Sequence, residues 1–495
     1  MTGKRILLIL FVLFVGIYSL TFQGCRDDDL LAPPYSELTF SSDTILFDTV
    51  FTTIGSATKG LKVYNNHNKL ININSVELGK GSSSEFRINV DGESGHNINN
   101  VEIEANDSIY IFAEVTVDPV NQDLPYIITD SITFRSNETT QNVQLAAWGQ
   151  DANFIRPDDE IYINGDTIKC HLINENTNWT SDLPNVVYGL VIVSPGNTLT
   201  IEEGTRVHMH NNASLLFLGE STFKVMGSMD HPVIIEGSRL ESHYRERPGQ
   251  WGRIWMMATS RDHEINNAVI KNGTVGLQVD SIGSHVDPTL SLKNTFVRNM
   301  STAGIVAQGS HVVGENVVVS NCGENTLNLS LGGKYDFRHS TFANYYNISI
   351  RQTPSLVLNN YYQDIDGNYQ VRELEKAYFG NSIIYGNLEE EIMFDFYQEG
   401  EKANYSFDHS ILKTAKNIDG DDYIDVLKNK DPQFYNISDN DYRLLESSPA
   451  IDAGNPQISQ DIPYDIIGNS RQERSDIGAY QYYEFEDNDD NNDDN

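Results

Sequence analysis

The chain has 495 residues, enough for two or three domains that each bury a core of their own. It carries 70 acidic side chains against 34 lysines and arginines, and its formal net charge of −36 leaves no long basic stripe for a phosphate backbone, which excludes nucleic acid as an expected partner. Short apolar alternations separated by Asn, Gly, Asp and Ser recur throughout and favour an all-β protein. Three cysteines cannot form a disulfide framework, so we expect Cys170 and Cys322 to be small buried side chains.

Residues 1–24 have the pattern of a lipoprotein signal peptide. Lys4 and Arg5 precede the apolar run ILLILFVLFVGIYSLT, which is shorter than the ~20 residues that a spanning helix needs. The run ends in Phe-Gln-Gly-Cys, which resembles a bacterial lipobox with Cys25 as the lipidated residue. Phe22 departs from the strict pattern and is similar to the looser lipobox of Bacteroidota lipoproteins. Acyl chains on Cys25 would hold the protein on a membrane without a spanning segment.

The acidic stretch CRDDD at residues 25–29 resembles the signal that sends Bacteroidota lipoproteins to the cell surface. This resemblance implies an outer-membrane protein, anchored by lipid and facing the cell exterior. A solvated acidic linker is the alternative interpretation. Residues 25–36, which include Pro33 and Pro34, are predicted to be a tether.

Residues 37–152 are predicted to form an immunoglobulin-like β-sandwich. In DSIYIFAEVTVDP, the side chains of Ile109 and Ile111 face one way, while those of Tyr110 and Phe112 face the other. Turn clusters separate several such strands, and no helical period appears. The segment carries no convergent His, Cys or acidic cluster, and we interpret it as a stalk.

A short template repeats within residues 158–430. NAVIKN, NTFVRN, NVVVSN and HSTFAN follow one another at about 22 to 27 residues, the length of one coil of a solenoid. In a parallel β-helix, equivalent positions of successive coils stack at ~4.8 Å. The predicted apolar inner column is Val269, Phe296 or Val297, Val318 and Phe342. Because Asn tolerates left-handed backbone, the template also predicts an amide ladder at the turns, formed by Asn272, Asn299, Asn321 and Asn344.

Two motifs add a family resemblance. GNTLTIEEGT at residues 196–205 and PGQWGRI at residues 248–254 are similar to motifs of bacterial pectin-lyase-like β-helix proteins, and DPQFYNISDNDYRLLESSPAIDAG with GNSRQERSDIGAYQY resembles the terminal module of surface β-helices. The resemblance implies a right-handed parallel β-helix over 158–430 and a C-terminal capping module over 431–483. It does not imply an activity, because this fold carries lyases, hydrolases, adhesins and scaffolds alike. Residues 484–495 are predicted to be a disordered acidic tail.

The strongest candidate for ligand binding is the stretch 238–255. Guanidinium forks grip carboxylate or sulfate, and aromatic rings stack on sugars, so this composition favours an acidic glycan or an acidic protein loop. The alternative is that the arginines pair with Glu241 and Glu246 while Trp251 and Trp255 pack on the coil. The candidate residues are Arg239, His243, Tyr244, Arg245, Arg247, Trp251 and Arg253.

Metal and catalytic signals are weaker. His208 and His210 project from one face of a strand without a third ligand near, so we interpret them as an exterior polar pair. The acidic runs 364–370 and 417–425 lack glycine at the sixth position of an EF-hand loop, so calcium is the only cofactor considered, and it would be weakly held. The sequence lacks the Asp-pair, Gly-His-Gly and Arg-x-Lys signatures of pectin-degrading hydrolases, and no catalytic residue is assigned.

The sequence therefore predicts a non-catalytic lipoprotein that binds a polysaccharide or docks on an outer-membrane protein complex. A polysaccharide lyase or hydrolase of the pectin-lyase fold is the first alternative, and a lyase is the expected enzyme if the protein is one. A structural subunit of outer-membrane assembly or transport machinery is the second.

Overall fold

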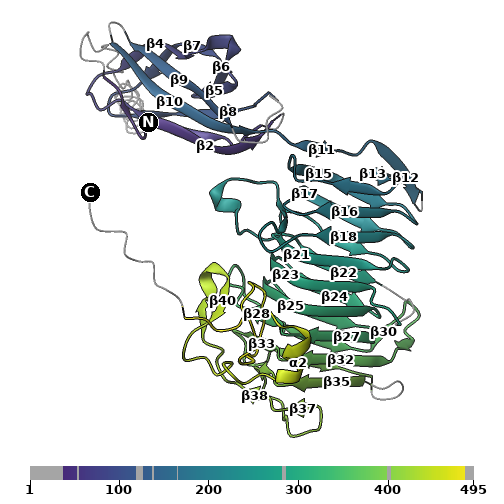
Figure 1. Ribbon diagram of the computed structural model, residues 1–495. Coiled ribbons are helices and arrows are strands. Elements are labelled where there is room, and N and C mark those ends of the chain that lie inside the picture. Colours follow the sequence, from purple (N-terminus) through teal and green to yellow (C-terminus); the bar gives the residue numbers. More distant parts are fainter. Residues whose placement is uncertain are drawn as a thin grey trace, which may run out of the picture. The chain divides into compact units, whose positions relative to one another are not determined.

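The computed structural model describes residues 37–52, 55–118, 126–136, 139–163, 165–280, 286–397 and 403–484. The predicted signal peptide, lipidated Cys25, the tether and residues 485–495 of the predicted tail lie outside these ranges. The chain divides after Asp151 into two compact units, and each is described by itself (Figure 1). Within the described ranges, regular structure is almost entirely strand, with the short helix α2 (Pro456–Asp461) near the C-terminal end.

The first unit consists of two five-stranded sheets that share one apolar core. One sheet has the order β1 (Thr39–Phe40), β3 (Lys59–Tyr64), β8 (Ser108–Val115), β5 (Phe86–Val90), β6 (Glu93–Gly95). The other has the order β2 (Thr44–Phe51), β10 (Thr139–Gln150), β9 (Tyr126–Ser136), β4 (Ile71–Leu78), β7 (Asn97–Ile103). The alternation predicted for β8 is confirmed: Ile109 and Ile111 are buried, and Tyr110 and Phe112 are exposed.

The second unit is built on one sheet of 26 strands. Apart from the antiparallel hairpin of β12 (Asp159–Ile163) and β13 (Asp166–Ile173), every pairing in this sheet is parallel. The strands wind around a single interior, in which nearly all side chains of the apolar cluster are fully buried. A parallel sheet needs long connections between paired strands, and here each connection contains the strands of the neighbouring stacks.

The registers sort the strands of this sheet into three stacks. The first stack contains β11 (Asn153–Ile155), the starts of β15 (Asn185–Val193) and β17 (Arg206–Phe217), β19 (Val233–Gly237), the ends of β21 (His263–Lys271), β23 (Leu290–Met300) and β25 (His311–Cys322), β28 (Thr341–Asn344), β33 (Ile383–Gly386), β36 (Ile411–Leu412) and β38 (Leu427–Lys428). Figure 1 shows these strands following one another down the unit.

The other two stacks complete each coil. The second contains β13, the ends of β15 and β17, β20 (Ile254–Met256), β22 (Val275–Asp280), β24 (Ala303–Gln308), β26 (Leu327–Ser330), β29 (Leu356–Asn359) and β34 (Ile392–Asp395). The third contains β14 (Thr177–Trp179), β16 (Thr198–Glu202), β18 (Thr222–Met226), the starts of β21, β23 and β25, β27 (Gly333–Arg338), β32 (Leu374–Gly380), β35 (Ala403–Asp408) and β37 (Tyr423–Ile424).

A one-residue corner joins the third stack to the first in successive coils. Each corner residue has a left-handed backbone with φ between 46° and 53°, which Asn and related polar residues adopt at small cost. The corner residues, which are the first residues of the repeated template and its later copies, are Asn267, Asn294, Asn316, His339, Asn381 and His409.

The corner sets which strand residues face inward, and it corrects the predicted inner column. The inward residues of the first stack are Ile270, Val297, Val319 and Phe342, all fully buried in the interior cluster. Phe342 and the alternative Val297 were predicted correctly, whereas Val269, Phe296 and Val318 point outward. Val318 is nevertheless only 2% exposed, because another part of the chain covers it.

The asparagines that close the template lie at equivalent positions, but their side chains do not form a continuous amide ladder. Asn272, Asn299 and Asn321 have left-handed φ values of 72°, 55° and 51°. Asn321 donates to Asn440 at 2.7 Å and Asn344 donates to the Glu324 carbonyl at 3.1 Å. Segments that lie over this edge of the first stack therefore supply most of the partners.

Residues 431–483, here called the C-terminal module, were expected to lie across the open end of the coils. They pack instead along the outer side of the first stack, where Figure 1 shows β40 (Asp441–Leu444) and α2 beside β28 and β33. The reason is the apolar outer column of this stack, which needs a cover of its own. The cluster they share is formed mainly by Val318, Ala343, Ile383, Tyr385, Ile411, Phe434, Tyr442, Leu444, Ala450, Ile466, Ile477, Ala479 and Tyr480.

The corner residues also hold the C-terminal module by hydrogen bonds. Asn316 donates to the Tyr464 carbonyl at 2.9 Å, and Asn381 donates to the Asn455 carbonyl at 3.0 Å. A ring nitrogen of His339 lies 2.9 Å from the Ser459 hydroxyl, and burial lowers the pKa of His339 well below its usual value. These polar corners therefore serve two purposes: they turn the chain and they bind the module.

Candidate binding site

The predicted binding residues lie between β19 and β20, but the structure divides them among different surroundings. Trp251 is fully buried in the interior, and its indole N–H donates to the Lys271 carbonyl at 2.8 Å. Arg253 lies beside the second stack, where it donates to the side chain of Gln278 at 2.5 Å. These two residues are therefore structural, and they do not join the other candidates.

The remaining candidates share the exposed loop 239–250. Arg239 donates to both carboxylate oxygens of Glu241 at 2.9 to 3.1 Å, and its guanidinium lies 3.9 Å from the Tyr244 ring centre. Arg247 contacts the His243 ring at 3.3 Å. Arg245 and Arg247 are exposed, and within the described ranges no hydrogen bond or ion pair involves the Arg245 guanidinium. The loop thus presents one free and one weakly engaged cation.

A charged network fixes the base of this loop to the first stack. Lys271, whose side chain is 9% exposed, donates to Glu246 and to the Arg245 carbonyl, each at 3.1 Å. Arg298 pairs with Glu246 at 3.4 Å, and Asn299 also donates to this carboxylate. The loop backbone therefore has little freedom at Arg245 and Glu246, although the neighbouring cations point to solvent.

The same network sets the charge state of Glu246. Burial alone would raise the pKa of this carboxyl, but the nearby Arg298 and Lys271 outweigh burial and hold the pKa below its usual value. Lys271 also pairs with Glu236 at 3.1 Å, so one ammonium bridges two carboxylates. Glu236, Lys271 and Arg298 occupy equivalent positions of successive coils. The alternative interpretation of the stretch 238–255 named loop arginines as partners of Glu246. Lys271 and Arg298 are the partners in the structure, and the sequence does not indicate them because they lie on later coils.

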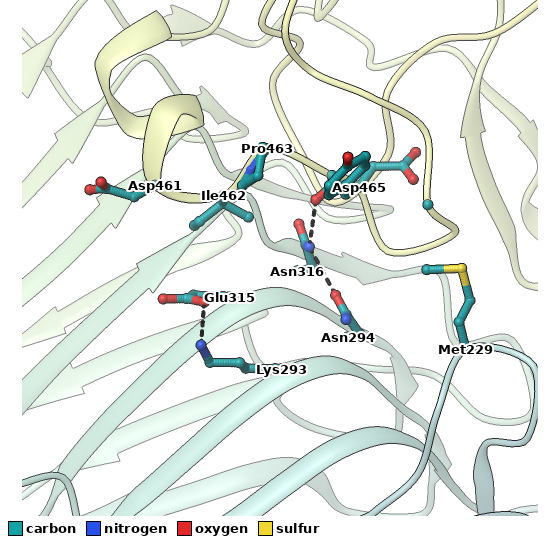
Figure 2. A pocket seen from close by; sticks show the side chains of 11 residues that line it. Met229, Lys293, Asn294, Glu315, Asn316, Asp461, Ile462, Pro463 and Asp465 are labelled. Carbon is teal, nitrogen blue, oxygen red and sulfur yellow. Dashed lines mark hydrogen bonds and ion pairs between the residues drawn. The ribbon is translucent and has the colours of Figure 1, made fainter.

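A pocket of about 480 Å³ separates the C-terminal module from the corners of the coils (Figure 2). Its floor contains Asn316, which donates to the Asn294 side chain at 2.9 Å as well as to Tyr464. Lys293 and Glu315 form an ion pair of 3.1 Å at one side. No local pattern in the sequence indicates this pocket, because its walls come from segments more than a hundred residues apart.

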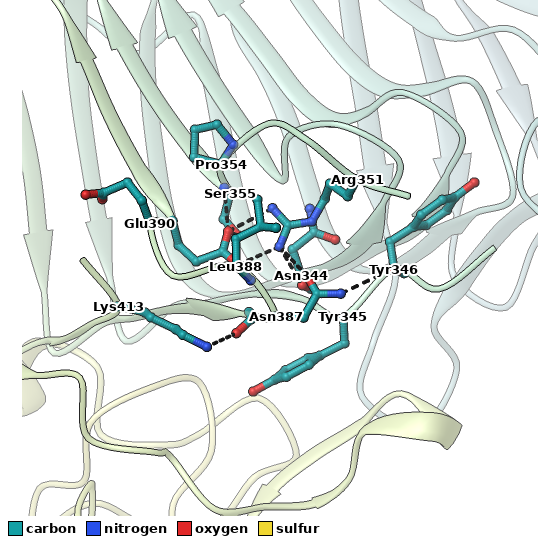
Figure 3. A network of polar contacts seen from close by, with 12 residues as sticks. Asn344, Tyr345, Tyr346, Arg351, Pro354, Ser355, Asn387, Leu388, Glu390 and Lys413 are labelled. Carbon is teal, nitrogen blue, oxygen red and sulfur yellow. Dashed lines mark hydrogen bonds and ion pairs between the residues drawn. The ribbon is translucent and has the colours of Figure 1, made fainter. Parts of the chain in front are cut away.

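A second charged pair is fully enclosed (Figure 3). Arg351 and Glu391 have side chains that are 1% and 0% exposed, and they contact each other at 2.5 Å. Ser355 donates to Glu391 through both its N–H and its hydroxyl, and Arg351 also donates to Asn387 at 2.7 Å. These contacts fix the path of the chain between β28 and β34. Because solvent does not reach the pair, it is not available to a ligand.

His208 and His210 do not form the exterior polar pair that the sequence predicts. His208 is 4% exposed and not on an open exterior; it lies 3.7 Å from Glu236, and burial lowers its pKa. His210 lies 3.0 Å from the Ser238 hydroxyl and packs against Tyr188.

The acidic run 364–370, considered for calcium, forms a turn in which Asp364 accepts the N–H groups of Asp366 and Asn368. In the described part of the chain, no group of three or more His, Cys, Asp or Glu side chains is placed to hold a metal ion.

Two further observations concern the whole described structure. Cys170 and Cys322 are buried free thiols, as predicted. Among the described residues, no helix combines the length and the apolar character that crossing a membrane requires.

Comparisons with known proteins do not identify a family. No protein-family model matches the sequence, and no curated protein sequence is detectably similar to it. Solved structures with partial likeness include a family 123 glycoside hydrolase from Clostridium perfringens (12% identity, TM-score 0.19), a protein of unknown function from Porphyromonas gingivalis W83 (16%, 0.17) and the E. coli chaperone DraB (10%, 0.17). Each match covers 24% of this chain, and 28%, 52% and 56% of those chains respectively. Likeness this limited supports no conclusion on fold or function.

Proposed function

We propose that the protein is a cell-surface lipoprotein of the outer membrane that binds an anionic polysaccharide through the loop 239–250 and does not cleave it. The observation that carries the proposal is the pair Arg245 and Arg247: both are exposed, and they flank Glu246, which is tied to the first stack by Lys271 and Arg298. Cys25 and the acidic residues after it support the membrane anchor and the outward orientation.

For the fold, we infer that the second unit is a right-handed parallel β-helix and the first an immunoglobulin-like sandwich. The three stacks of parallel strands, with equivalent residues in register around one interior, support the first inference. Two packed sheets with alternating side chains support the second.

Binding follows from the chemistry of the loop. A guanidinium presents several donors in a plane that matches a carboxylate or a sulfate. Because the backbone at Arg245 and Glu246 is already fixed, a ligand orders only the arginine side chains, which lowers the entropy cost of binding. The net charge of −36 repels a polyanion from most of the remaining surface, so contact is directed to this loop.

Cleavage has less support than binding. A lyase needs a base that can reach the polymer. His263 is almost fully enclosed and burial lowers its pKa to about 3, while His339 lies beneath the C-terminal module. Neither of these two rings can act on an exposed polysaccharide. The exposed ring of the loop, His243, contacts the Arg247 guanidinium at 3.3 Å.

Affinity electrophoresis in gels that contain polygalacturonate, a sulfated glycan or a neutral glycan tests the proposal. We expect an anionic polymer to retard the wild-type chain, and we expect Arg245→Ser with Arg247→Ser to weaken this interaction about tenfold or more. Arg261→Ser is the matched control, since Arg261 is an exposed arginine on the third-stack side that pairs with Glu220. Equal retardation of all variants, or unsaturated products and new reducing ends on incubation, would refute the proposed function.

The anchor has its own test. Cys25→Ala should release the protein from the outer-membrane fraction, and protease added to intact cells should digest the wild-type protein. Stable co-purification with an outer-membrane complex, without polysaccharide binding, would instead favour the role of a structural subunit.

A further inference from the structure

The first unit carries a second pocket, on the outer side of the sheet β1–β3–β8–β5–β6. It has a volume of about 650 Å³, within the size range of small-ligand sites, and it is lined by residues of β8, β5 and the segment around β6. The sequence predicts a stalk without a binding site for this unit, and a stalk does not need such a pocket.

Phe112 supplies an apolar surface at this pocket. Its side chain is 45% exposed, and the ring is the large apolar side chain among the residues that line the pocket from β8. Across the sheet it faces Gly60 on one neighbouring strand and Asn89 on the other, and the ring lies over Gly60, where a Cβ would contact it at 3.6 Å. One side of the Phe112 ring stacks on the Tyr110 ring, with 6.0 Å between the ring centres, and the Lys62 ammonium lies 5.5 Å from the Tyr110 centre. Of these two rings, Phe112 and not Tyr110 lines the pocket.

Free polar groups of both kinds surround Phe112. Arg87 and Glu114 are directly opposite each other on β5 and β8, and both are exposed. Within the described ranges, neither side chain forms a hydrogen bond or an ion pair, although opposite charges at this position commonly pair. Asn89 is held in place, because it donates to the Ser94 hydroxyl at 2.8 Å and accepts from the Gly92 N–H at 3.0 Å. The pocket thus combines one ring, unpaired donors and unpaired acceptors.

We propose that this pocket binds a neutral saccharide unit, with the sugar ring on Phe112 and its hydroxyl groups on Arg87 and Glu114. A sugar hydroxyl both donates and accepts, so it needs the donor and the acceptor that these two side chains supply. The C–H face of a sugar ring is apolar and packs on an exposed aromatic ring. Arg87 and Glu114 have no net charge together, so the pocket does not select the polyanion proposed for the loop 239–250.

Affinity electrophoresis of the purified full-length chain in gels of neutral polysaccharides, such as xylan, galactomannan and a soluble β-glucan, tests this inference. At least one of them should retard the wild-type protein. Phe112→Ala should weaken that interaction about tenfold or more, and the nearly isosteric Glu114→Gln should weaken it about threefold or more. Ile127→Ala is the matched control, because Ile127 is 65% exposed on β9 of the other sheet. It should bind as the wild type does.

The inference is overturned if no neutral polysaccharide retards the wild-type chain, or if Phe112→Ala and Glu114→Gln bind as Ile127→Ala does. Binding of the anionic polymer is measured with the same variants. It should be unchanged in Phe112→Ala, so the failure of this pocket and the failure of the loop 239–250 give different results.

Discussion

Two irregular segments cover the outer side of the same strand stack, and they do so by different means. The loop 239–250 is held by charges: Glu246, which is partly open to solvent, meets the buried Lys271 and the partly exposed Arg298. The C-terminal module is held by an apolar cluster in which Ile383 is 1% exposed and Tyr442 is also 1% exposed. One cover therefore leaves free cations at its surface, and the other completes a core.

The outer column of the stack explains the difference. Where the loop lies, successive coils present Glu236, Lys271 and Arg298. Where the C-terminal module lies, the same positions are Ser320, Ala343 and Tyr385. Inner positions are apolar throughout, so the fold does not require this change. Outward residues decide whether a coil carries a polar loop or a second core.

The largest effect is expected beneath the C-terminal module. Ile383→Ala should lower the free energy of unfolding of the second unit by about 2–5 kcal/mol, because it removes buried methyl groups and leaves a cavity. Urea unfolding measures this change. Ile350→Ala is the control, since Ile350 is 90% exposed and its truncation should change stability by less than about 0.5 kcal/mol. A small effect of Ile383→Ala would mean that the module does not pack on this stack.

A smaller effect is expected at the corners. Asn381→Ala removes the bonds to Asn455 and leaves buried polar groups without partners, which should cost about 1–3 kcal/mol. Limited proteolysis should then cut the C-terminal module sooner than in the wild type. Asn267→Ala has the same left-handed φ problem, but the bond that it loses goes to the Gly227 carbonyl and not to the module. It therefore separates the cost of the turn from the cost of losing the module. Equal protease sensitivity of the two variants would contradict the role of Asn381 in holding the C-terminal module.

Charge removal beneath the loop should cost less. Glu246→Gln keeps the shape but weakens the contacts to Lys271 and Arg298, and we expect a loss of about 1 kcal/mol because the carboxylate is partly open to solvent. Urea unfolding at low salt measures it. Glu241→Gln, which changes a pair within the loop, should have little effect on stability.

The same variant tests a pH dependence. The folded-state pKa of Glu246 is held below the unfolded value of about 4.3, so its contribution is fully present above that pH and is lost as the pH falls through the folded pKa. The stability difference between the wild type and Glu246→Gln should therefore be constant from about pH 7 to pH 5 and should shrink below about pH 4. A difference that grows in acid would contradict the assigned network.

The smallest effect is expected at the rim of the pocket in Figure 2. Lys293→Met breaks the ion pair with Glu315, in which the two side chains are 56% and 37% exposed, and it should change stability by less than about 1 kcal/mol. Differential scanning fluorimetry measures this change. A change larger than about 1 kcal/mol would contradict the prediction and show that the pair is more than a surface contact.

Local patterns predicted much of the architecture. The repeated template placed Asn272, Asn299 and Asn321 at equivalent turns, and the alternation of β8 was visible in the sequence. Val269 and Val318 were wrongly predicted to face the interior. An apolar side chain that points outward beneath a covering segment cannot be told from an inward one by its residue type alone. Only the left-handed residue at the start of each template fixes the phase. The sequence suggested that conformation for the closing asparagine, where it does occur, but not for the residue at the start.

The site was less predictable, because its partners come from distant coils. Arginines in the stretch 238–255 could be counted, but the sequence could not show that Arg253 meets Gln278 or that Lys271 and Arg298 converge on Glu246. The pairing of Arg239 with Glu241 was an alternative open from the start, since the two are close in sequence. The pocket at Phe112 needed the register of β3, β8 and β5, which side-chain alternation alone does not supply.

Amide hydrogen exchange of the full-length chain, measured with and without an anionic polysaccharide, tests the central claim most directly. We predict slower exchange in residues 239–250 when the polymer is present and no change in residues 431–483. Protection confined to the C-terminal module, or no protection in the loop at polymer concentrations that retard the protein in gels, would contradict the account.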